Sequence, residues 1–263
     1  MGSSLYRLHL GPGWRTAAPA AVRDRVAGRT VVVTGASSGI GRATAVALAS
    51  AGAQVIGLAR RSELLHDLAD ELRGLGSTAE MITCDLTRPE DVDRAVAVLA
   101  ERPVDIVVSN AGLSLHRTVR ASRDACRDLD RSVGTNLTGP AHLLVGLVEQ
   151  MLRRPDAHWV HSGSVSALVP TRGWASYAGS KAGFDAWWRA VASELGGRDR
   201  HLWTSMIHFP LVQTPMSSPT YRTQWALTAE QAASVVLAAL VRRPRTLAPW
   251  WARIAAAGQA LAR

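Results

Sequence analysis

Lysine is nearly absent from this chain. Only one of its 30 lysine and arginine residues, Lys181, is a lysine, and the other 29 are arginine. Arginine supplies a positive charge equally well, whereas a compact ammonium group on a flexible stem can also accept and release a proton. Lys181 follows Tyr177 by four residues, which is one turn of a helix. The single lysine therefore indicates a proton-transfer pair with that tyrosine.

Cysteine, metal-binding clusters and long apolar runs are also scarce or missing. The two cysteines, Cys84 and Cys126, are too few for a disulfide framework. The eight histidines form no metal-ligand cluster, so we expect no metal. There is no run of about 18 apolar residues, so no membrane-spanning helix is expected. Residues 1–29 lack the apolar core of a secretory signal, and we therefore expect a cytoplasmic protein.

The positive charge of the chain is large but scattered. The formal net charge is +9 and the pI is about 11.0. In the densest stretch, residues 117–131, arginines alternate with Asp124, Asp128 and Asp130, as on a solvated helical face. A polyanion site is the alternative for this stretch. Because the basic residues form no stripe or cluster, the charge does not favour nucleic acid as a partner.

Strand-like and helix-like segments alternate along the 263 residues, a pattern typical of one parallel sheet with helices on both faces. The expected strands are 30–34, 54–58, 79–84, 104–108, one that begins at 159, and 201–208. The expected helices are 41–51, 63–75, 89–101, one or two over 122–153, 177–195 and 229–242. We therefore predict a single-domain α/β fold with a doubly wound parallel sheet, preceded by an irregular extension over residues 1–28.

A glycine-rich turn joins the first expected strand to the first expected helix, with the spacing Gly-x3-Gly-x-Gly. Such a turn presents backbone N–H groups and a helix N-terminus to a phosphate. Glycine also lets a pyrophosphate approach the backbone closely. The candidate contacts are Gly35, Ser37, Ser38, Gly39, Ile40 and Gly41. A purely structural turn is the alternative.

The end of the second expected strand indicates which dinucleotide binds. An acidic residue there would hold the ribose 2′-OH of NAD, but none occurs between Gln54 and Ser62. A basic residue at this place accommodates a 2′-phosphate. We therefore expect NADP(H), with Arg60 as the main contact and Ser37 or Arg61 as helpers. The alternative is that both arginines are ordinary surface residues.

Further motifs follow in one order along the chain, and with the glycine-rich turn they resemble those of the short-chain dehydrogenase/reductase family over about residues 28–245. These motifs are Asp85, Asn110–Gly112, Asn136, Ser164, Tyr177 and Lys181. The resemblance implies a Rossmann-type NAD(P)-binding catalytic domain over residues 29–249. It also implies an oxidoreductase that moves a hydride to or from a carbonyl carbon.

In this family the tyrosine of the Tyr-x3-Lys motif is the acid or base, so the resemblance gives this role to Tyr177. A free tyrosine has a pKa of about 10, and we expect Lys181 to lower it by stabilising the phenolate. The family's lysine also binds the nicotinamide ribose. The alternative is a buried helical tyrosine followed by an ordinary surface lysine.

The resemblance assigns two further catalytic residues. Ser164 lies thirteen residues before Tyr177 and matches the serine that orients the substrate oxygen, although Ser162 and Ser166 flank it. Asn136 matches the asparagine that holds a water of the proton relay. A hydrogen bond to the helix backbone is the alternative role for this asparagine.

The remaining cofactor contacts also come from the resemblance. They are Asp85 and Leu86 at the adenine, Asn110, Ala111 and Gly112 at the adenosine ribose, and Pro210, Val212 and Thr214 near the nicotinamide and pyrophosphate. One position departs from the family pattern, because Leu211 stands where a glycine commonly follows the proline. The placement of Val212 and Thr214 is therefore left open.

Residues 210–216 are similar to those of actinobacterial members that act on long-chain acyl thioesters or fatty aldehydes. We therefore expect an NADPH-dependent reduction of a hydrophobic substrate. The candidate pocket residues are Leu113, Leu168, Trp174, Leu211, Met216, Tyr221 and Trp225, with core packing as the alternative for each. The competing functions are ketone reduction on a secondary metabolite and non-catalytic NADP binding by a redox sensor.

Tryptophan is unusually frequent, with nine residues against two phenylalanines. Trp187 and Trp188 lie on the expected helix of Tyr177, which in the family often forms a subunit interface. We therefore expect a homodimer or homotetramer, with one of the two tryptophans facing the core and the other a partner. Residues 250–263 form an amphipathic segment that could pack on a subunit, cover the active site or rest on a membrane surface, the last being the less favoured.

Overall fold

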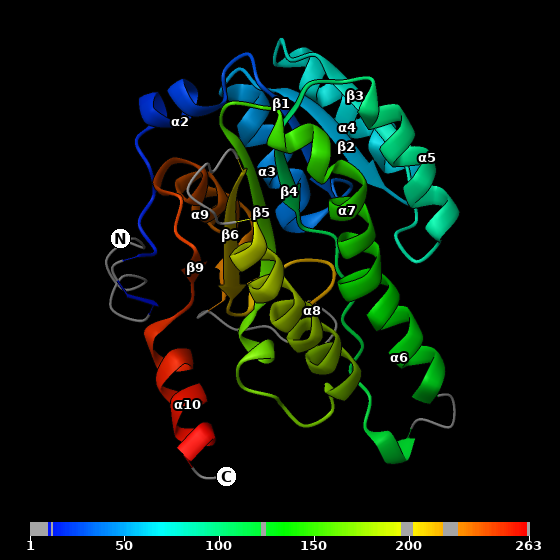
Figure 1. Cartoon of the computed structure of the whole chain (residues 1–263), viewed down its shortest axis with the longest axis vertical. Coiled ribbons are helices and arrows are strands. Elements are labelled where there is room, and N and C mark those ends of the chain that lie inside the picture. The colour runs from blue at the N-terminus through cyan, green and yellow to red at the C-terminus, as the bar shows by residue number, and fades with distance from the viewer. Residues whose placement is uncertain (1–9, 12, 122–124, 196–201, 218–225, 262–263) are drawn as a thin grey trace.

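The computed structural model describes residues 10–11, 13–121, 125–195, 202–217 and 226–261. A parallel sheet runs through the centre of the molecule, and helices pack on both of its faces (Figure 1). Its seven strands are ordered β3-β2-β1-β4-β5-β6-β9. Their bounds are β1 (Thr30–Thr34), β2 (Gln54–Ala59), β3 (Ala79–Thr83), β4 (Val104–Ser109), β5 (Ala157–Ser164), β6 (Leu202–Phe209) and β9 (Thr246–Leu247). The predicted α/β fold is therefore confirmed as a single Rossmann-type domain.

The central strand β1 explains why the molecule has two cores. All five of its residues are buried. Because successive side chains of a strand point to opposite faces, Val31 and Val33 join one apolar cluster and Val32 joins the other. A strand covered on both faces has no polar side to show, and this is why the sequence reads as an uninterrupted β-branched run.

Helices divide between these two cores. The core that contains Val31 also receives α2 (Pro19–Val26), α3 (Gly39–Ser50), α4 (Ser62–Gly74) and α9 (Ala229–Arg242). The opposite core receives α5 (Pro89–Ala100), α7 (Gly139–Leu152) and α8 (Ala175–Glu194). Next to α8 lies α6 (Ala125–Val133), and α10 (Trp250–Leu261) lies at the same lower end of the molecule, on its other side (Figure 1).

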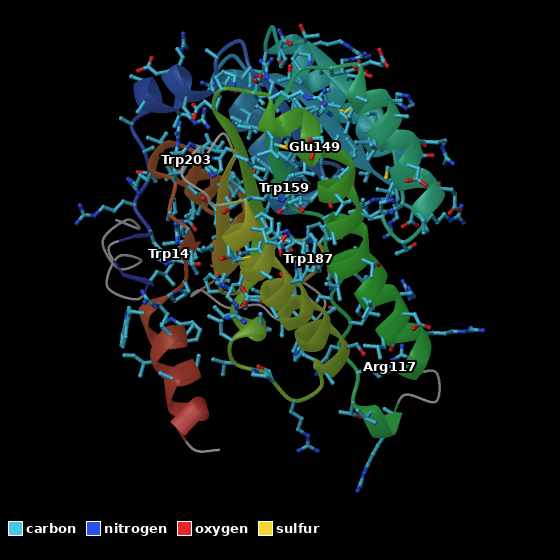
Figure 2. All side chains as sticks on the ribbon, viewed as in Figure 1. Trp14, Arg117, Glu149, Trp159, Trp187 and Trp203 are labelled. Atoms are coloured by element: carbon cyan, nitrogen blue, oxygen red, sulfur yellow. The ribbon has the colours of Figure 1, made fainter. Side chains whose placement is uncertain are left out.

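The adjacent tryptophans of α8 have different surroundings. Trp188 is buried, and its ring centroid lies 6.5 Å from that of Trp159 on β5. Trp187 is half-buried on the same helix and packs 5.4 Å from Phe184 (Figure 2). One tryptophan faces the core as expected, while the expectation of a partner beside Trp187 stays a prediction.

Four elements differ from the expectations. The segment expected to be irregular contains α2, and the edge strand β9 was not anticipated. A small second ladder joins β7 (Val212–Gln213) to β8 (Leu227–Thr228). Strands of two residues are too short to show a hydrophobic period, so the sequence gives no signal for them. Within the described part of the chain, no helix has both the length and the apolar character needed to cross a membrane.

The order of the strands locates the site. From β1 the chain builds outward to β2 and β3 on one side, and from β4 to β5 and β6 on the other. Where the strand order reverses in an open parallel sheet, the carboxyl ends of the two central strands leave a crevice that binds ligands. The crevice at the ends of β1 and β4 is therefore the place to look for a functional site.

Candidate active site

A cavity of about 420 Å³ opens at the carboxyl ends of the central strands. It unites most of the residues that the sequence singles out, although they lie up to about 180 positions apart in the chain. The predicted residues that line it are Gly35, Ser37, Ser38, Gly39, Ile40, Arg60, Arg61, Asp85, Leu86, Asn110, Ala111, Gly112, Ser164, Trp174, Tyr177, Lys181, Pro210, Leu211, Val212, Thr214 and Met216.

A few predicted residues are placed elsewhere. Leu113 and Leu168 are half-buried but are not among the residues that line the cavity. Gly41 and Asn136 do not line the cavity but contact the segments that form it. Tyr221 and Trp225 lie outside the described residues. Other residues of the lining carried no signal in the sequence, and they include Ser114, Thr135, Val165, Thr171 and Ser217.

The glycine-rich turn between β1 and α3 is a tightly packed cradle. Gly35 has a φ of 69° and Gly39 a φ of 55°, both in the left-handed region that favours glycine. A Cβ on Gly35 would lie 2.9 Å from the Cα of Ala111, and one on Gly41 would overlap the carbonyl oxygen of Gly35. The N-cap residue Ser38 makes no side-chain cap hydrogen bond. The first N–H groups of α3 are therefore available to a phosphate, and the cradle fits a dinucleotide pyrophosphate.

Two arginines follow β2 and face different partners. Arg61 donates from Nη2 to Oγ of Ser37 at 3.1 Å and to Oγ of Ser38 at 2.9 Å, so it lies over the glycine-rich turn. Arg60 is half exposed, and its Nη1 lies 3.8 Å from Oδ2 of Asp85. The predicted helper Arg61 is thus the arginine that reaches the turn, while Arg60 lies beside the predicted adenine contact.

Lys181 and Tyr177 project from α8 into the cavity. Lys181 is only 5% exposed, and its Nζ donates to the carbonyl oxygen of Ser162 at 2.9 Å. Burial lowers the pKa of Lys181 to about 8. Burial also raises the pKa of Tyr177. A hydrogen bond with Ser164 lowers this pKa, but its effect is smaller than that of burial. The expected lowering of the tyrosine pKa by Lys181 is therefore not found, because removal of the phenol from water outweighs the other influences.

Ser164 is held at the end of β5. Its Oγ accepts a hydrogen bond from the N–H of Ser166 at 3.1 Å and so caps the short helix η3 (Val165–Ala167). The same side chain is hydrogen-bonded to Tyr177. Ser162 and Ser166 also line the cavity, but the bond to the tyrosine selects Ser164 as the spacing predicted.

Asn136 lies in a π-helical turn, η2 (Gly134–Thr138), and is fully buried. Its Oδ1 accepts from the N–H of Leu113 at 2.9 Å, and its Nδ2 donates to the carbonyl of Leu113 at 2.8 Å and to Oγ of Ser180 at 2.9 Å. Ser180 in turn donates to the carbonyl of Tyr177 at 2.9 Å. Asn136 therefore links the loop after β4 to the helix of Tyr177. The π-turn itself gave no recognisable signal in the sequence.

The side chain of Ser217 holds the loop after β6, in which Leu211 stands at the position of the family's glycine. Oγ of Ser217 donates to the carbonyl of Val212 at 2.6 Å and accepts from the N–H of Thr214 at 3.0 Å. A Cβ on Gly39 would lie 3.1 Å from Cγ2 of Thr214. Thr214 therefore lies against the glycine-rich turn.

Apolar side chains form the part of the cavity beyond Tyr177. The Trp174 ring packs at 6.1 Å from the ring of Tyr177 and at 4.9 Å from that of His116. Leu211 and Met216 line the same cavity, and Met216 is 46% exposed. The lining therefore combines the polar groups of the glycine-rich turn with these apolar side chains.

The comparisons with known proteins agree with this geometry. The model of the family described as short chain dehydrogenase matches residues 29–225. A fatty acyl-CoA reductase of Acinetobacter baylyi is 33% identical over 244 residues, which cover 91% of this chain and 82% of that protein. One of Mycobacterium tuberculosis is 36% identical over 241 residues, or 89% of this chain and 80% of that protein.

Among solved structures, a short chain dehydrogenase of Burkholderia cenocepacia in complex with NADP matches with a TM-score of 0.73 and 26% identity. The match covers 84% of this chain and 93% of that chain. Sequence and structure therefore agree that the chain belongs to the short-chain dehydrogenase family of oxidoreductases.

Proposed function

We propose that this protein is an NADP(H)-dependent oxidoreductase that reduces the carbonyl group of a hydrophobic aldehyde, ketone or acyl thioester, with Tyr177 as the proton donor. The observation that carries this proposal is the meeting of Ser164, Tyr177 and Lys181 in one cavity with the glycine-rich turn. A carbonyl group bound beside these three residues would have a proton donor next to its oxygen.

The glycine-rich turn and the two arginines after β2 suit the binding of NADP(H). The N–H groups of α3 and the glycines of the preceding turn would hold the pyrophosphate, and Arg60 and Arg61 would hold the 2′-phosphate. No acidic residue stands at the end of β2 to bind a free 2′-hydroxyl. The solved relative in complex with NADP supports the same choice. When bound, the cofactor supplies the hydride that adds to the carbonyl carbon.

The residues of α8 and β5 would then supply the proton. Because burial raises its pKa, Tyr177 carries its proton at neutral pH and can give it to the carbonyl oxygen. Ser164 would hold that oxygen by a hydrogen bond. The ammonium group of Lys181 would stabilise the phenolate that remains, and its lowered pKa of about 8 suits a group that passes a proton onward.

The apolar side chains of the cavity lining suit a lipid-like substrate. Trp174, Leu211 and Met216 offer contact area without a charge. The relatives described as fatty acyl-CoA reductases support an acyl chain at this place. With an acyl thioester, hydride addition and protonation at oxygen are followed by departure of the thiol, which leaves an aldehyde.

The proposal is tested by NADPH oxidation across a panel of acyl-CoAs, aldehydes and ketones, with Tyr177→Phe as the diagnostic variant. Removal of the phenolic hydroxyl should lower turnover by a factor of roughly 10² to 10⁴, the usual contribution of a positioned general acid. The affinity for NADPH should stay nearly unchanged. Retention of turnover in Tyr177→Phe would remove Tyr177 from its proposed role, and inactivity of the wild type on the whole panel would contradict the proposed reaction.

A further inference from the structure

A buried histidine and a buried aspartate meet beneath the site. His208 on β6 is 2% exposed and Asp185 on α8 is 7% exposed. Nε2 of His208 lies 3.3 Å from Oδ1 of Asp185, which stands one helical turn beyond Lys181. Nδ1 of the same ring lies 3.2 Å from the carbonyl oxygen of Ser164. One imidazole therefore connects the helix of Tyr177 to the residue that hydrogen-bonds Tyr177.

Both nitrogens of this ring face groups that accept hydrogen bonds. A carbonyl oxygen has no proton to give, so Nδ1 of His208 must be the donor to Ser164. The other ring nitrogen, Nε2, then lies beside the carboxyl group of Asp185.

Other titratable groups lie on the elements that pack around this pair. Nη1 of Arg189, on the outer side of α8, lies 3.5 Å from Oδ2 of Asp185. On the neighbouring strand β5, burial keeps His161 neutral, with a pKa well below its usual value. Lys181 donates to Ser162. Asp185 is thus the acceptor for His208 on one side and for Arg189 on the other.

The local backbone explains why Ser164 needs a side-chain donor. Ser164 is paired with Phe209 in the β5–β6 ladder, and the following residue, Pro210, has no N–H to donate to the Ser164 carbonyl. Gly163 stands opposite His208 in the same ladder. A Cβ on Gly163 would lie 3.4 Å from Nδ1 of His208 and 2.8 Å from the sulfur of Met206. Glycine therefore leaves room for the ring beside the carbonyl.

We propose that Asp185 and His208 form a positioning pair that fixes Ser164 relative to Tyr177. This inference rests on the proposed function. Ser164 is then held at two points, by His208 at its carbonyl and by the N–H of Ser166 at its hydroxyl. Asp185 ties the same imidazole to α8 and so couples the serine and the tyrosine of the site. Neither residue of the pair lies in the lining of the cavity.

Two uncharged substitutions of His208 separate its contact with Ser164 from its contact with Asp185. In His208→Asn the amide nitrogen can take the place of Nδ1 and donate to Ser164, whereas in His208→Gln it takes the place of Nε2. We expect His208→Gln to lower kcat for NADPH oxidation with dodecanal or dodecanoyl-CoA roughly 10- to 100-fold, the cost of a small misplacement at a site. His208→Asn, which keeps the donor to Ser164 and loses only the contact with Asp185, should lose less activity than His208→Gln. Equal values of kcat in the two variants would overturn the inference.

The pH profile supplies a readout that a purely structural role would not change. The hydrogen bond from Ser164 lowers the pKa of Tyr177, so misplacement of the serine should raise it further. Since reduction needs the protonated phenol, the alkaline limit of kcat should move to higher pH in His208→Gln and stay in place in His208→Asn. The KM for NADPH should be the same in both. An unchanged alkaline limit in His208→Gln would contradict the positioning role.

Hydrogen exchange of the segment 163–168 tests the pair without any substrate. We expect exchange to be faster in His208→Gln than in the wild type and His208→Asn, at a temperature where all three are folded. Asp185→Asn, whose amide can donate to Nε2 and keep the proton on Nδ1, should exchange as slowly as the wild type. Identical exchange in His208→Gln and the wild type would overturn the inference. A wild type inactive on the whole substrate panel would instead count against the proposed function, which separates the two failures.

Discussion

Lys181 occupies a position that opposes folding. The side chain is 5% exposed, and its Nζ donates a hydrogen bond to the carbonyl oxygen of Ser162 at 2.9 Å. A buried ammonium group loses most of its hydration, which is why its pKa falls to about 8. An arginine, which keeps its proton throughout the physiological range, could not provide a group that both stabilises a phenolate and releases a proton. The single lysine of the chain therefore lies where its chemistry differs most from that of arginine.

The cost of this lysine should be visible in the pH dependence of stability. Between pH 8 and 10.5 the unfolded chain keeps the Lys181 proton while the native protein has released it, so the wild type gains stability as the pH rises. Relative to Lys181→Met, its free energy of unfolding should increase by roughly 3 kcal/mol across this range. Urea unfolding without cofactor at pH 7, 8, 9 and 10.5 measures the change. A constant difference between the two proteins would show that the ammonium group is well solvated or fully compensated.

At the residue scale, the sequence indicated which residues line the site better than it indicated the surroundings of each side chain. The spacing selected Ser164 over its neighbours and paired Tyr177 with Lys181, and the structure brings these three side chains to one cavity. The direction of the tyrosine pKa was expected wrongly, because burial depends on what other segments place around the ring. Leu113 follows Gly112 and Leu168 follows Ser164 by four residues, but neither leucine lines the cavity, because the path of the backbone in each loop determines where a side chain points.

At the scale of elements, one aspartate joins segments from both ends of the chain. Oδ2 of Asp156, just before β5, lies 2.9 Å from Arg25 of α2, 3.2 Å from Arg29 and 2.7 Å from Arg243 at the end of α9. Arg25 is buried, and burial lowers its pKa to about 10 although Asp156 acts in the opposite direction. The guanidinium carbon of Arg243 also lies 4.8 Å from the ring centroid of Trp203. The carboxylate is therefore the counter-charge for three converging cations.

Replacement of this aspartate should be strongly destabilising. In Asp156→Ala the three guanidinium groups would repel one another, with one of them buried, so we expect a loss of about 3 kcal/mol in the free energy of unfolding. The matched control is Asp70→Ala, which breaks the exposed pair with Arg73 and should cost less than about 0.5 kcal/mol. Chemical denaturation of the three proteins measures both values. Similar losses in the two variants would show that Asp156 contributes no more than a surface charge.

Long elements were predictable and short ones were not. The expected helix 229–242 has the bounds of α9, and the expected strand 30–34 has those of β1. Each is a long or fully apolar segment that ends at a polar, glycine or proline residue, so its pattern is clear. The π-turn around Asn136 and the strand β9 arise from packing against distant residues, such as the contact of Gly134 with Thr87. No local pattern encodes them.

At the scale of the whole molecule, the proposed cofactor site exists only when the sheet is assembled. Its lining comes from the ends of β1, β2, β4, β5 and β6 together with α8. The unfolded chain cannot bind the cofactor in this way, so binding stabilises the native state according to ligand concentration and affinity. The order of motifs along the sequence was enough to predict the fold and the family. The choice between the two dinucleotides depends on how β2 and the glycine-rich turn meet in space.

Thermal unfolding in the presence of each dinucleotide tests this choice. At a concentration of about 100 times Kd, NADPH should stabilise the protein by about 2.7 kcal/mol, which raises Tm by roughly 5 to 10 °C for a chain of this length. NADH at the same concentration should raise Tm much less, because the arginines after β2 would have no 2′-phosphate to bind. In Arg60→Ala most of this difference should disappear, and in the double variant with Arg61→Ala all of it. Arg73→Ala, an exposed arginine paired only with Asp70 among the described residues, serves as the control and should keep the full difference. Equal shifts of the wild type with NADPH and NADH would contradict the proposed preference for NADP(H).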